Sequence, residues 1–325
     1  MRLTVRAETW PIRGVFRIAR GARTEAEVVV VEIVEGKLRG RGECVPYRRY
    51  DESVAGVIAQ IESLADEVGR GMDRRVLAER LPAGAARNAV DCALWDLEAK
   101  RAHRPAWRLA DVPEPKPVTT AYTVSLADPE EMGATARAQA HRPLLKLKLT
   151  GDGDVERVRA VAAAAPHARL IADANEAWTP ETFAQVAPAV AALGVEMIEQ
   201  PLPAGRDAAL ADLEHPVPVC ADESCHTSSD IADVVGRYDA VNIKLDKTGG
   251  LTEALVLADA AAQAGFDLMV GCMIGTSLGI APAALLAPRA RWVDLDAPLL
   301  LAHDREPALR FEGSVLHPPD AALWG

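Results

Sequence analysis

Residues 144–250 decide the fold, because five short apolar segments in this stretch each carry charged residues. The segments are LLKLKL (144–149), LIADAN (170–175), VEMIEQP (195–201), VPVCADES (217–224) and AVNIKLDKTGG (240–250). From position 148 through 173, 199 and 222 to 244, the steps are 25, 26, 23 and 22 residues. Each step is the length of one strand plus one crossover helix. The spacing therefore predicts parallel strands whose carboxyl ends meet at one mouth.

The same pattern continues on both sides of this stretch. We expect strands near 119–125, 144–149, 169–174, 195–199, 217–222, 239–244, 266–271 and 291–295, with Ala-rich helical stretches between them. Eight short strands with seven intervening helical stretches predict an α/β protein with a (β/α)7β TIM-like barrel over residues 115–299. An open doubly wound sheet is the alternative that the same alternation allows.

Residues 1–110 predict a separate α+β capping domain. Residues 1–10 and 26–34 are Val-rich strand candidates, and residues 13–25 have the Gly- and Arg-rich composition of a mobile loop. Helices are predicted over 52–68, 73–81 and 85–102. The Pro-rich segment DVPEPKPV (111–118) marks the domain boundary. We expect the tail, residues 300–325, to pack back on this domain and complete it.

Composition restricts the classes of function. The chain has 325 residues, 49% of them hydrophobic, which is enough for a barrel and a smaller second domain. A net charge of −11 disfavours binding to nucleic acid or to anionic lipid. The amino terminus lacks a secretory h-region, no apolar run reaches membrane-span length, and the five cysteines form no metal-binding pattern. These features predict a cytoplasmic protein without nucleic-acid or membrane partners.

The lysine segment predicts a general base. Lys146 and Lys148 alternate with leucines and so share one face of their strand. Lysines inside a barrel need charged partners or a chemical role, whereas lysines on an edge strand would simply be solvated. The like charge of Lys146 is expected to lower the pKa of Lys148 from about 10.4 toward working pH. Lys244 ends a later strand and would form the opposite wall of the mouth.

Three acidic residues at consecutive strand ends, Asp173, Glu199 and Asp222, predict a metal site. Converging carboxylates repel one another unless a cation neutralises them. Oxygen ligands without His or Cys suit a hard cation, and Mg²⁺ leaves coordination positions for substrate oxygens. Ca²⁺ and Mn²⁺ remain alternatives on the residues alone.

Other charged residues predict contacts with a substrate. Asp294 and Asp296 lie two residues apart, on one side of the mouth, where they could bind an ammonium group or simply form an acidic turn. Arg20 or Arg23 could bind a substrate carboxylate if the segment around them folds over the mouth. Gly249 and Gly250 predict a tight strand-to-helix turn, with close approach to the substrate as the alternative. Glycine-rich nucleotide motifs and catalytic histidine patterns are absent from the sequence.

The motifs together resemble those of one known group of enzymes. KLK (146–148), DAN (173–175), EQP (199–201), ADES (221–224) and NIKLDKTGG (242–250) are similar to the motifs of the enolase superfamily, muconate lactonizing enzyme subgroup. AVDCALWDLEAK (89–100) and YTVS (122–125) extend the resemblance over nearly the whole chain. DLDAPLLL (294–301) together with ARGARTE (19–25) resembles the dipeptide epimerases of that subgroup.

This resemblance implies an isomerase and assigns a role to each residue. It implies that Asp173, Glu199 and Asp222 hold one Mg²⁺ per subunit and that Lys148 and Lys244 are the two acid/base groups. The substrate-binding residues would be Lys146, the pair Asp294 and Asp296 for an α-ammonium group, and Arg23 for a side-chain carboxylate, with Arg20 close enough to compete. The implied reaction is a two-base 1,1-proton transfer through an enediolate, a chemistry known for the superfamily.

The implied substrate is a dipeptide such as L-Ala-L-Glu or L-Ala-D-Glu, inverted at the α-carbon of its C-terminal residue, with a role in murein peptide recycling. Two alternatives stay open: a lyase of the same superfamily, such as an o-succinylbenzoate synthase or a cycloisomerase, and a non-catalytic metal-binding barrel. The Asp294 and Asp296 pair favours the epimerase, because a substrate without an ammonium group has no use for it. A homo-oligomer is compatible with the sequence, which leaves the oligomeric state open.

Overall fold

The computed structural model describes all 325 residues. The amino-terminal block contains a three-stranded antiparallel sheet, in the order β1-β2-β3, and a layer of helices. Its elements are β1 (Arg2–Ile18), β2 (Gly21–Glu35), β3 (Leu38–Cys44), α1 (Val54–Glu62), α2 (Ala65–Gly69), α3 (Arg74–Arg80), α4 (Ala85–Ala102) and α5 (Ala106–Leu109). Val29, Val31 and Ile33 of β2 pack against one face of α4 in a separate core of 18 buried residues. This block therefore has its own hydrophobic core, as α+β domains do.

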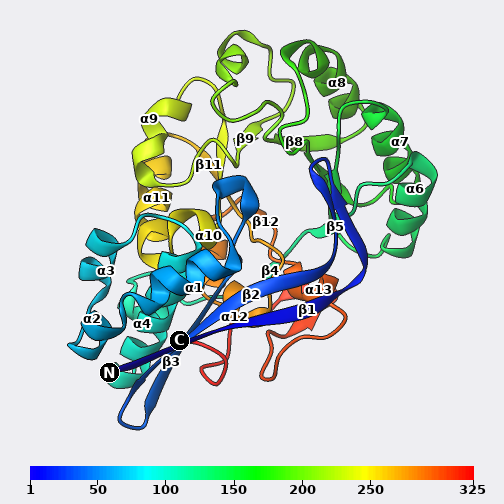
Figure 1. Cartoon of the computed structure of the whole chain (residues 1–325). Helices are drawn as coiled ribbons and strands as arrows, with labels where there is room; N and C mark the ends of the chain where they lie inside the picture. Colours follow the sequence, from blue (N-terminus) through cyan, green and yellow to red (C-terminus); the bar gives the residue numbers. More distant parts are fainter.

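The prediction of a mobile loop over residues 13–25 is wrong. β1 and β2 continue through this segment as one long hairpin, in which Phe16 pairs with Arg23 and Ile18 with Gly21 after an irregularity between Pro11 and Phe16. The hairpin extends from the amino-terminal block across to the β8 side of the other domain (Figure 1). Antiparallel pairing supplies the backbone hydrogen bonds that a free loop would lack.

Eight parallel strands form the second sheet, in the order β12-β11-β10-β9-β8-β7-β6-β5. They are β5 (Tyr122–Val124), β6 (Leu144–Lys148), β7 (Arg169–Asp173), β8 (Val195–Glu199), β9 (Val219–Ala221), β10 (Ala240–Ile243), β11 (Asp267–Val270) and β12 (Trp292–Val293). Ala121, beside β5, donates its N–H to Val293 O of β12 at 2.8 Å and so joins the first and last strands. This arrangement confirms the TIM-like barrel with an amino-terminal cap.

The crossovers vary more than the sequence pattern predicts. α6 (Pro129–Ala138), α7 (Asp154–Ala164), α8 (Pro180–Ala192) and α11 (Leu251–Gln263) are regular helices. The connection from β8 to β9 is a short 3-10 turn over Ala208–Asp212, and α9 (Ile231–Val234), α10 (Leu245–Thr248) and α12 (Ser277–Ile280) are single turns. None of the helices combines the length and hydrophobicity that a membrane crossing requires.

The carboxyl-terminal tail contacts both domains. After α13 (Ala297–Leu300), β13 (Phe311–Glu312) and β14 (Val315–Leu316) form a small sheet with β4 (Val118–Thr119). Trp324 is buried and donates from Nε1 to Cys92 O of α4 at 2.9 Å, while Gly325 N donates to Asp96 Oδ1. The division into 1–110 with 300–325 and 115–299 stays a prediction.

Candidate active site

The barrel interior is built in tiers, because side chains along a strand alternate between two faces. The floor is a cluster of buried residues, one at each strand: Ala121, Leu144, Ile171, Met197, Cys220, Ala240, Met269 and Trp292. Two residues further along each strand, the inward positions are Thr123, Lys146, Asp173, Glu199, Asp222, Asn242, Gly271 and Asp294. An apolar floor is thus followed by a tier that is polar at every position except Gly271.

Lys146 occupies the centre of this polar tier. Its Nζ lies 2.6 Å from Glu199 Oε2, 2.8 Å from Asp294 Oδ2 and 3.3 Å from Asp173 Oδ2, and its side chain is 1% exposed. Burial acts to lower the pKa of Lys146, but these carboxylates outweigh burial and raise that pKa well above its ordinary value. Lys146 is therefore a fixed positive charge that offsets part of the acidic cluster. The alternative of solvated lysines on an edge strand is wrong, because β6 lies between β5 and β7 and is buried throughout.

The two candidate bases lie on opposite sides of the barrel. Lys148 ends β6, and its Nζ is 2.6 Å from Asp173 Oδ2. Lys244 directly follows β10, and its Nζ is 2.6 Å from Asp222 Oδ2 and 3.8 Å from Glu199 Oε1. In the strand order, β6 and β10 are four steps apart, which is the greatest separation possible in a closed barrel of eight strands. The two amino groups therefore approach the mouth from facing walls.

Each candidate base has a carboxylate beside it, and for Lys244 the direction of the resulting pKa shift is clear. Burial acts to lower the pKa of Lys244, but Asp222 and Glu199 raise it above its ordinary value. The expectation that Lys146 lowers the pKa of Lys148 stays a prediction. Burial acts to raise the pKa of Asp222, yet Lys244 and Lys247 bring it well below its ordinary value.

The acidic residues suit a hard cation by their chemistry. Asp173, Glu199 and Asp222 are fully buried and offer only oxygen ligands, which Mg²⁺ prefers. Glu199 Oε2 and Asp222 Oδ1 accept no hydrogen bond, although a lysine Nζ lies within ion-pair distance of each. No group of three acidic residues is close enough to hold a metal ion in the present arrangement. A bound cation would therefore have to replace some of the lysine contacts.

A cavity brings both lysines together with the acidic pair near the last strand. It is lined by Lys148, Lys244, Asp294 and Asp296, and by Phe16 from the hairpin. Asp296 Oδ2 accepts a hydrogen bond from Thr123 N at 2.6 Å. Burial, and then the charge of Asp294, raise the pKa of Asp296 to about 7. The structure therefore places both acidic residues in the same cavity as the candidate bases.

The two arginines of the hairpin have different surroundings. Arg20 donates to Asn175 O, Glu176 Oε2, Tyr47 Oη and Glu223 Oε1 at 2.6–3.0 Å, so protein acceptors surround its guanidinium. Arg23 forms no hydrogen bond or ion pair, and its guanidinium carbon lies 5.4 Å from the centre of the Tyr47 ring. Cross-strand partners in an antiparallel pair point to the same face, and the partner of Arg23 is Phe16, which lines the cavity.

Two residues that the sequence interpretation left without a role, Gln200 and Lys247, bond to one of the acidic residues, Asp222. Gln200 accepts from Asp222 N and Ser224 N through Oε1, and its backbone has a φ of 36°. The buried Nζ of Lys247 lies 2.8 Å from Asp222 Oδ1 and also donates to Asn242 O and Cys225 O. Positive φ is costly for residues other than glycine and concentrates at functional sites. In the sequence, the signal that could have identified Gln200 and Lys247 was an amide or charged side chain within a few residues of a strand end.

Gly249 and Gly250 form the predicted turn, with φ of 76° and 112°. A side chain at Gly249 would overlap Arg87, and one at Gly250 would overlap Asp91. Both of these neighbours belong to α4. The close approach that these glycines permit is therefore to the amino-terminal block, and the alternative of an approach to substrate is not needed.

Both parts of the chain match known families. Residues 1–110 match the mandelate racemase / muconate lactonizing enzyme N-terminal domain, and residues 131–322 match the enolase C-terminal domain-like family. L-Ala-D/L-Glu epimerase of Escherichia coli K12 is 52% identical over 95% of this chain and 97% of its own length. N-acetyl-D-glutamate racemase of a Pseudoalteromonas species is 46% identical over 92% of this chain and 95% of its own length.

Solved structures agree with these matches. An enolase family member from Agrobacterium tumefaciens with homology to dipeptide epimerases, bound to sodium and L-Ala-L-Glu, has a TM-score of 0.98 and 53% identity, with 99% of each chain covered. A dipeptide epimerase from Enterococcus faecalis, complexed with Mg and L-Leu-L-Tyr, has a TM-score of 0.91 and 30% identity, with 98% of this chain and 97% of that chain covered. The chain therefore belongs to the mandelate racemase / muconate lactonizing enzyme family of the enolase superfamily.

Proposed function

We propose that this protein is a Mg²⁺-dependent dipeptide epimerase, an isomerase that inverts the α-carbon of the C-terminal residue of a dipeptide. The observation that carries the proposal is the pair Lys148 and Lys244, on strands that face each other across one cavity. The reaction has to remove a proton from one face of the α-carbon and return a proton to the other, and two facing amines suit this task. The 52% identity with an L-Ala-D/L-Glu epimerase supports L-Ala-L-Glu and L-Ala-D-Glu as the substrate pair.

Asp173, Glu199 and Asp222 would hold one Mg²⁺ per subunit. When bound, the ion supplies positive charge that stabilises the charge developing on the substrate carboxylate and favours the neutral form of the nearby lysines. Lys146 contributes a further fixed positive charge from below, within 3.3 Å of Asp173 and 2.6 Å of Glu199.

Lys148 and Lys244 carry the proton transfer. For one epimer, the neutral Nζ of Lys148 takes the α-proton and the Lys244 ammonium donates a proton to the opposite face. For the other epimer, the two residues exchange roles. A single base would have to cross the plane of the intermediate, which the fixed positions of β6 and β10 prevent.

The remaining charges select a dipeptide with an acidic C-terminal residue. Asp294 and Asp296 face the cavity and bind the α-ammonium group of the N-terminal residue. Arg23 has no protein acceptor, and its side chain lies on the same face of the hairpin as Phe16. It therefore binds the side-chain carboxylate of a C-terminal Glu. Arg20 already has protein acceptors, and its role is to hold the tip of the hairpin against the barrel through Glu176 and Glu223.

A second candidate activity is racemisation of an N-acyl glutamate. The 46% identity with an N-acetyl-D-glutamate racemase supports it. Asp294 already pairs with Lys146, and burial raises the pKa of Asp296 to about 7. The negative charge of the two carboxyl groups is therefore offset without an ammonium group from the substrate. An N-acetyl group could then occupy the position of the N-terminal residue.

Exchange of the α-proton in D₂O tests the proposal. With Mg²⁺, the enzyme should incorporate one deuterium into L-Ala-L-Glu and L-Ala-D-Glu, and EDTA should abolish the exchange until Mg²⁺ is added back. Lys148→Ala and Lys244→Ala should each slow epimerisation by about 10³-fold, the scale expected for general acid–base catalysis. If N-acetylglutamate exchanges faster than either dipeptide, the second candidate replaces the first. If a cyclohexadiene acid is dehydrated while no α-proton exchanges, the protein is a lyase of the superfamily.

A role in murein peptide recycling, a cytoplasmic location and a homo-oligomeric state each stay a prediction.

A further inference from the structure

The amino-terminal block contacts the short segment that carries Lys244. We name residues 244–250 the lysine turn; it contains Lys244, the one-turn helix α10 and the pair Gly249–Gly250. From α4, Arg87 donates to Thr248 O at 2.6 Å and to Gly249 O at 3.2 Å. The glycines leave no space between the turn and α4, since a side chain at Gly250 would overlap Asp91. The turn is therefore pressed against a helix of the other domain.

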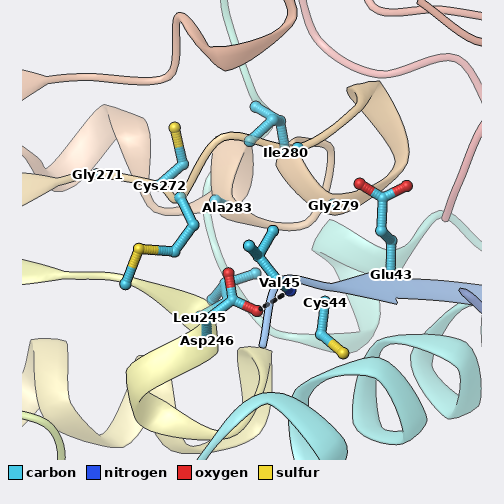
Figure 2. Close-up of a pocket in the computed structure, with 12 residues that line it drawn as sticks. Glu43, Cys44, Val45, Leu245, Asp246, Gly271, Cys272, Gly279, Ile280 and Ala283 are labelled. Carbon is cyan, nitrogen blue, oxygen red and sulfur yellow. Dashed lines mark hydrogen bonds between the residues drawn. The ribbon is translucent and has the colours of Figure 1, made fainter. Parts of the chain in front are cut away.

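Asp246 is the one side chain of the lysine turn that bonds to the amino-terminal block. Its Oδ1 accepts hydrogen bonds from Val45 N and from Asn88 Nδ2, each at 2.9 Å. Figure 2 shows the Asp246 carboxylate joined to Val45 by this hydrogen bond, and both residues line a cavity that residues of the two domains enclose. Cys272 and Met273 line both this cavity and the one that contains Lys148 and Lys244, so the two cavities share a wall.

The opposite side of the turn is held from within the barrel. Lys247 donates to Asn242 O at 2.8 Å and to Cys225 O at 2.9 Å, and it also bonds to Asp222 O. These contacts fix the turn to the ends of β9 and β10. Contacts from the amino-terminal block, through Asp246, fix its other side. Lys244 is two residues from Asp246 and its Nζ projects into the catalytic cavity.

We infer that Asp246 is a positioning residue for Lys244, through which the amino-terminal domain sets the geometry of one of the two bases. The inference rests on the proposed epimerase function. A reacting group displaced by about 1 Å can lose about 10²-fold in rate, so a turn that is free to shift would impair this base specifically. Lys148, on the far wall, forms no hydrogen bond with the amino-terminal block; its neighbour there is Phe16, whose ring centre lies 5.9 Å from its Nζ. A change at Asp246 should therefore leave Lys148 unaffected.

The stereochemistry of the reaction separates this role from general stabilisation. Loss of the α-proton from one epimer depends on Lys244, and loss from the other epimer depends on Lys148. Lys148→Ala and Lys244→Ala identify which epimer is which. The informative quantity is the ratio of the two α-proton exchange rates in D₂O, measured on the Mg²⁺-loaded enzyme with L-Ala-L-Glu and L-Ala-D-Glu. A merely destabilised protein loses both rates together and keeps the ratio.

Asp246→Ala should lower the exchange rate of the Lys244-dependent epimer about tenfold relative to the other, with kcat reduced and KM little changed. Asp246→Asn keeps an oxygen acceptor for both donors and should restore the wild-type ratio. Glu43→Ala is the matched control. It also removes a buried carboxylate from the domain interface, where Glu43 accepts from Thr276 N and Oγ1, but Thr276 lies outside the lysine turn.

A milder variant covers the case in which Asp246→Ala does not fold. Asn88→Ala removes one of the two donors and should shift the ratio in the same direction by about threefold, half the tenfold effect on a free-energy scale. In hydrogen-exchange measurements, the Val45 amide should exchange faster in Asp246→Ala and not in Asp246→Asn.

The outcomes separate the two proposals. If the variants of Asp246 and Asn88 lower both exchange rates equally, or if Glu43→Ala changes the ratio as Asp246→Ala does, the positioning role is wrong and the epimerase stands. If the wild-type enzyme exchanges no dipeptide α-proton, the proposed function fails and this inference fails with it.

Discussion

At the scale of single residues, the site depends on how buried charges compensate one another. Lys146 has three carboxylates within 3.3 Å and is almost completely buried. Removing one partner of such a cluster leaves an uncompensated buried charge, which costs about 3–5 kcal/mol. The lysines and the acidic residues therefore depend on one another, and a single substitution among them should destabilise the folded barrel as well as alter the candidate site.

Arg23 provides a prediction about specificity. Arg23→Gln should raise KM for L-Ala-L-Glu by about 10–100-fold, because a charge-assisted hydrogen bond contributes about 1.5–3 kcal/mol. The same change should leave kcat/KM for L-Ala-L-Leu within about twofold. Steady-state kinetics with both dipeptides measure the difference. Arg17→Gln is the control, since Arg17 lies on the same hairpin and its side chain contacts no protein acceptor. Equal losses for the two dipeptides would show that Arg23 does not read the acidic side chain.

At the scale of elements, the β1–β2 hairpin and the lysine turn connect the two domains. The hairpin ends at Arg20, whose guanidinium bonds to residues directly after β7 and β9. It thereby carries Phe16 to the catalytic cavity. The hairpin was missed in the sequence because Gly14, Gly21 and several arginines resemble a loop, while cross-strand pairing depends on a partner strand that local composition does not reveal.

Gly250 tests the close packing of α4 against the lysine turn. Gly250→Ala should destabilise the protein by about 2–4 kcal/mol, because the backbone has a φ of 112° and the new Cβ would overlap the Asp91 carboxylate. Gly36→Ala is the control. Gly36 also has positive φ, at 58°, but no atom lies within 4 Å of the position of its Cβ, so only backbone strain of about 1 kcal/mol is expected. Urea denaturation of the two variants measures both values, and equal losses would mean that α4 can move away at no cost.

At the scale of the whole molecule, buried carboxylates join the two domains by accepting hydrogen bonds across the domain interface. Glu43 accepts from Thr276 N at 2.7 Å and pairs with Arg305, Asp91 accepts from Thr252, and Asp246 accepts from Val45. Glu43 and Asp246 line the same interdomain cavity (Figure 2). A buried carboxyl group with only neutral donors favours its protonated form.

Asp246 should make the stability of the protein sensitive to pH. Burial raises the pKa of Asp246 from 3.8 to about 7 in the folded protein. The folded state then holds a proton that the unfolded state has released, so the free energy of unfolding should fall as pH rises from about 4 to about 7 and then level off. Asp246→Asn removes this contribution, and its Tm relative to wild type should rise with pH across that window.

Calorimetry at pH 5, 6, 7 and 8 measures the effect. The exposed Asp212, which contacts no partner, supplies the control variant Asp212→Asn, for which no such trend is expected. A Tm difference between Asp246→Asn and wild type that stays constant from pH 5 to pH 8 would show that Asp246 does not titrate in this range.

The sequence by itself determined the barrel and the tier of charged residues within it. Strand spacing and the two-residue alternation of side chains are local properties, so they suffice to place Lys146, Asp173, Glu199 and Asp222 on one inner surface. Tertiary structure alone decided that residues 13–25 pair as a hairpin, that Arg20 has protein acceptors while Arg23 has none, and that the lysine turn lies against α4. Those features depend on contacts between segments up to 203 residues apart, such as Arg20 with Glu223, and a local pattern of residues carries no information about such partners.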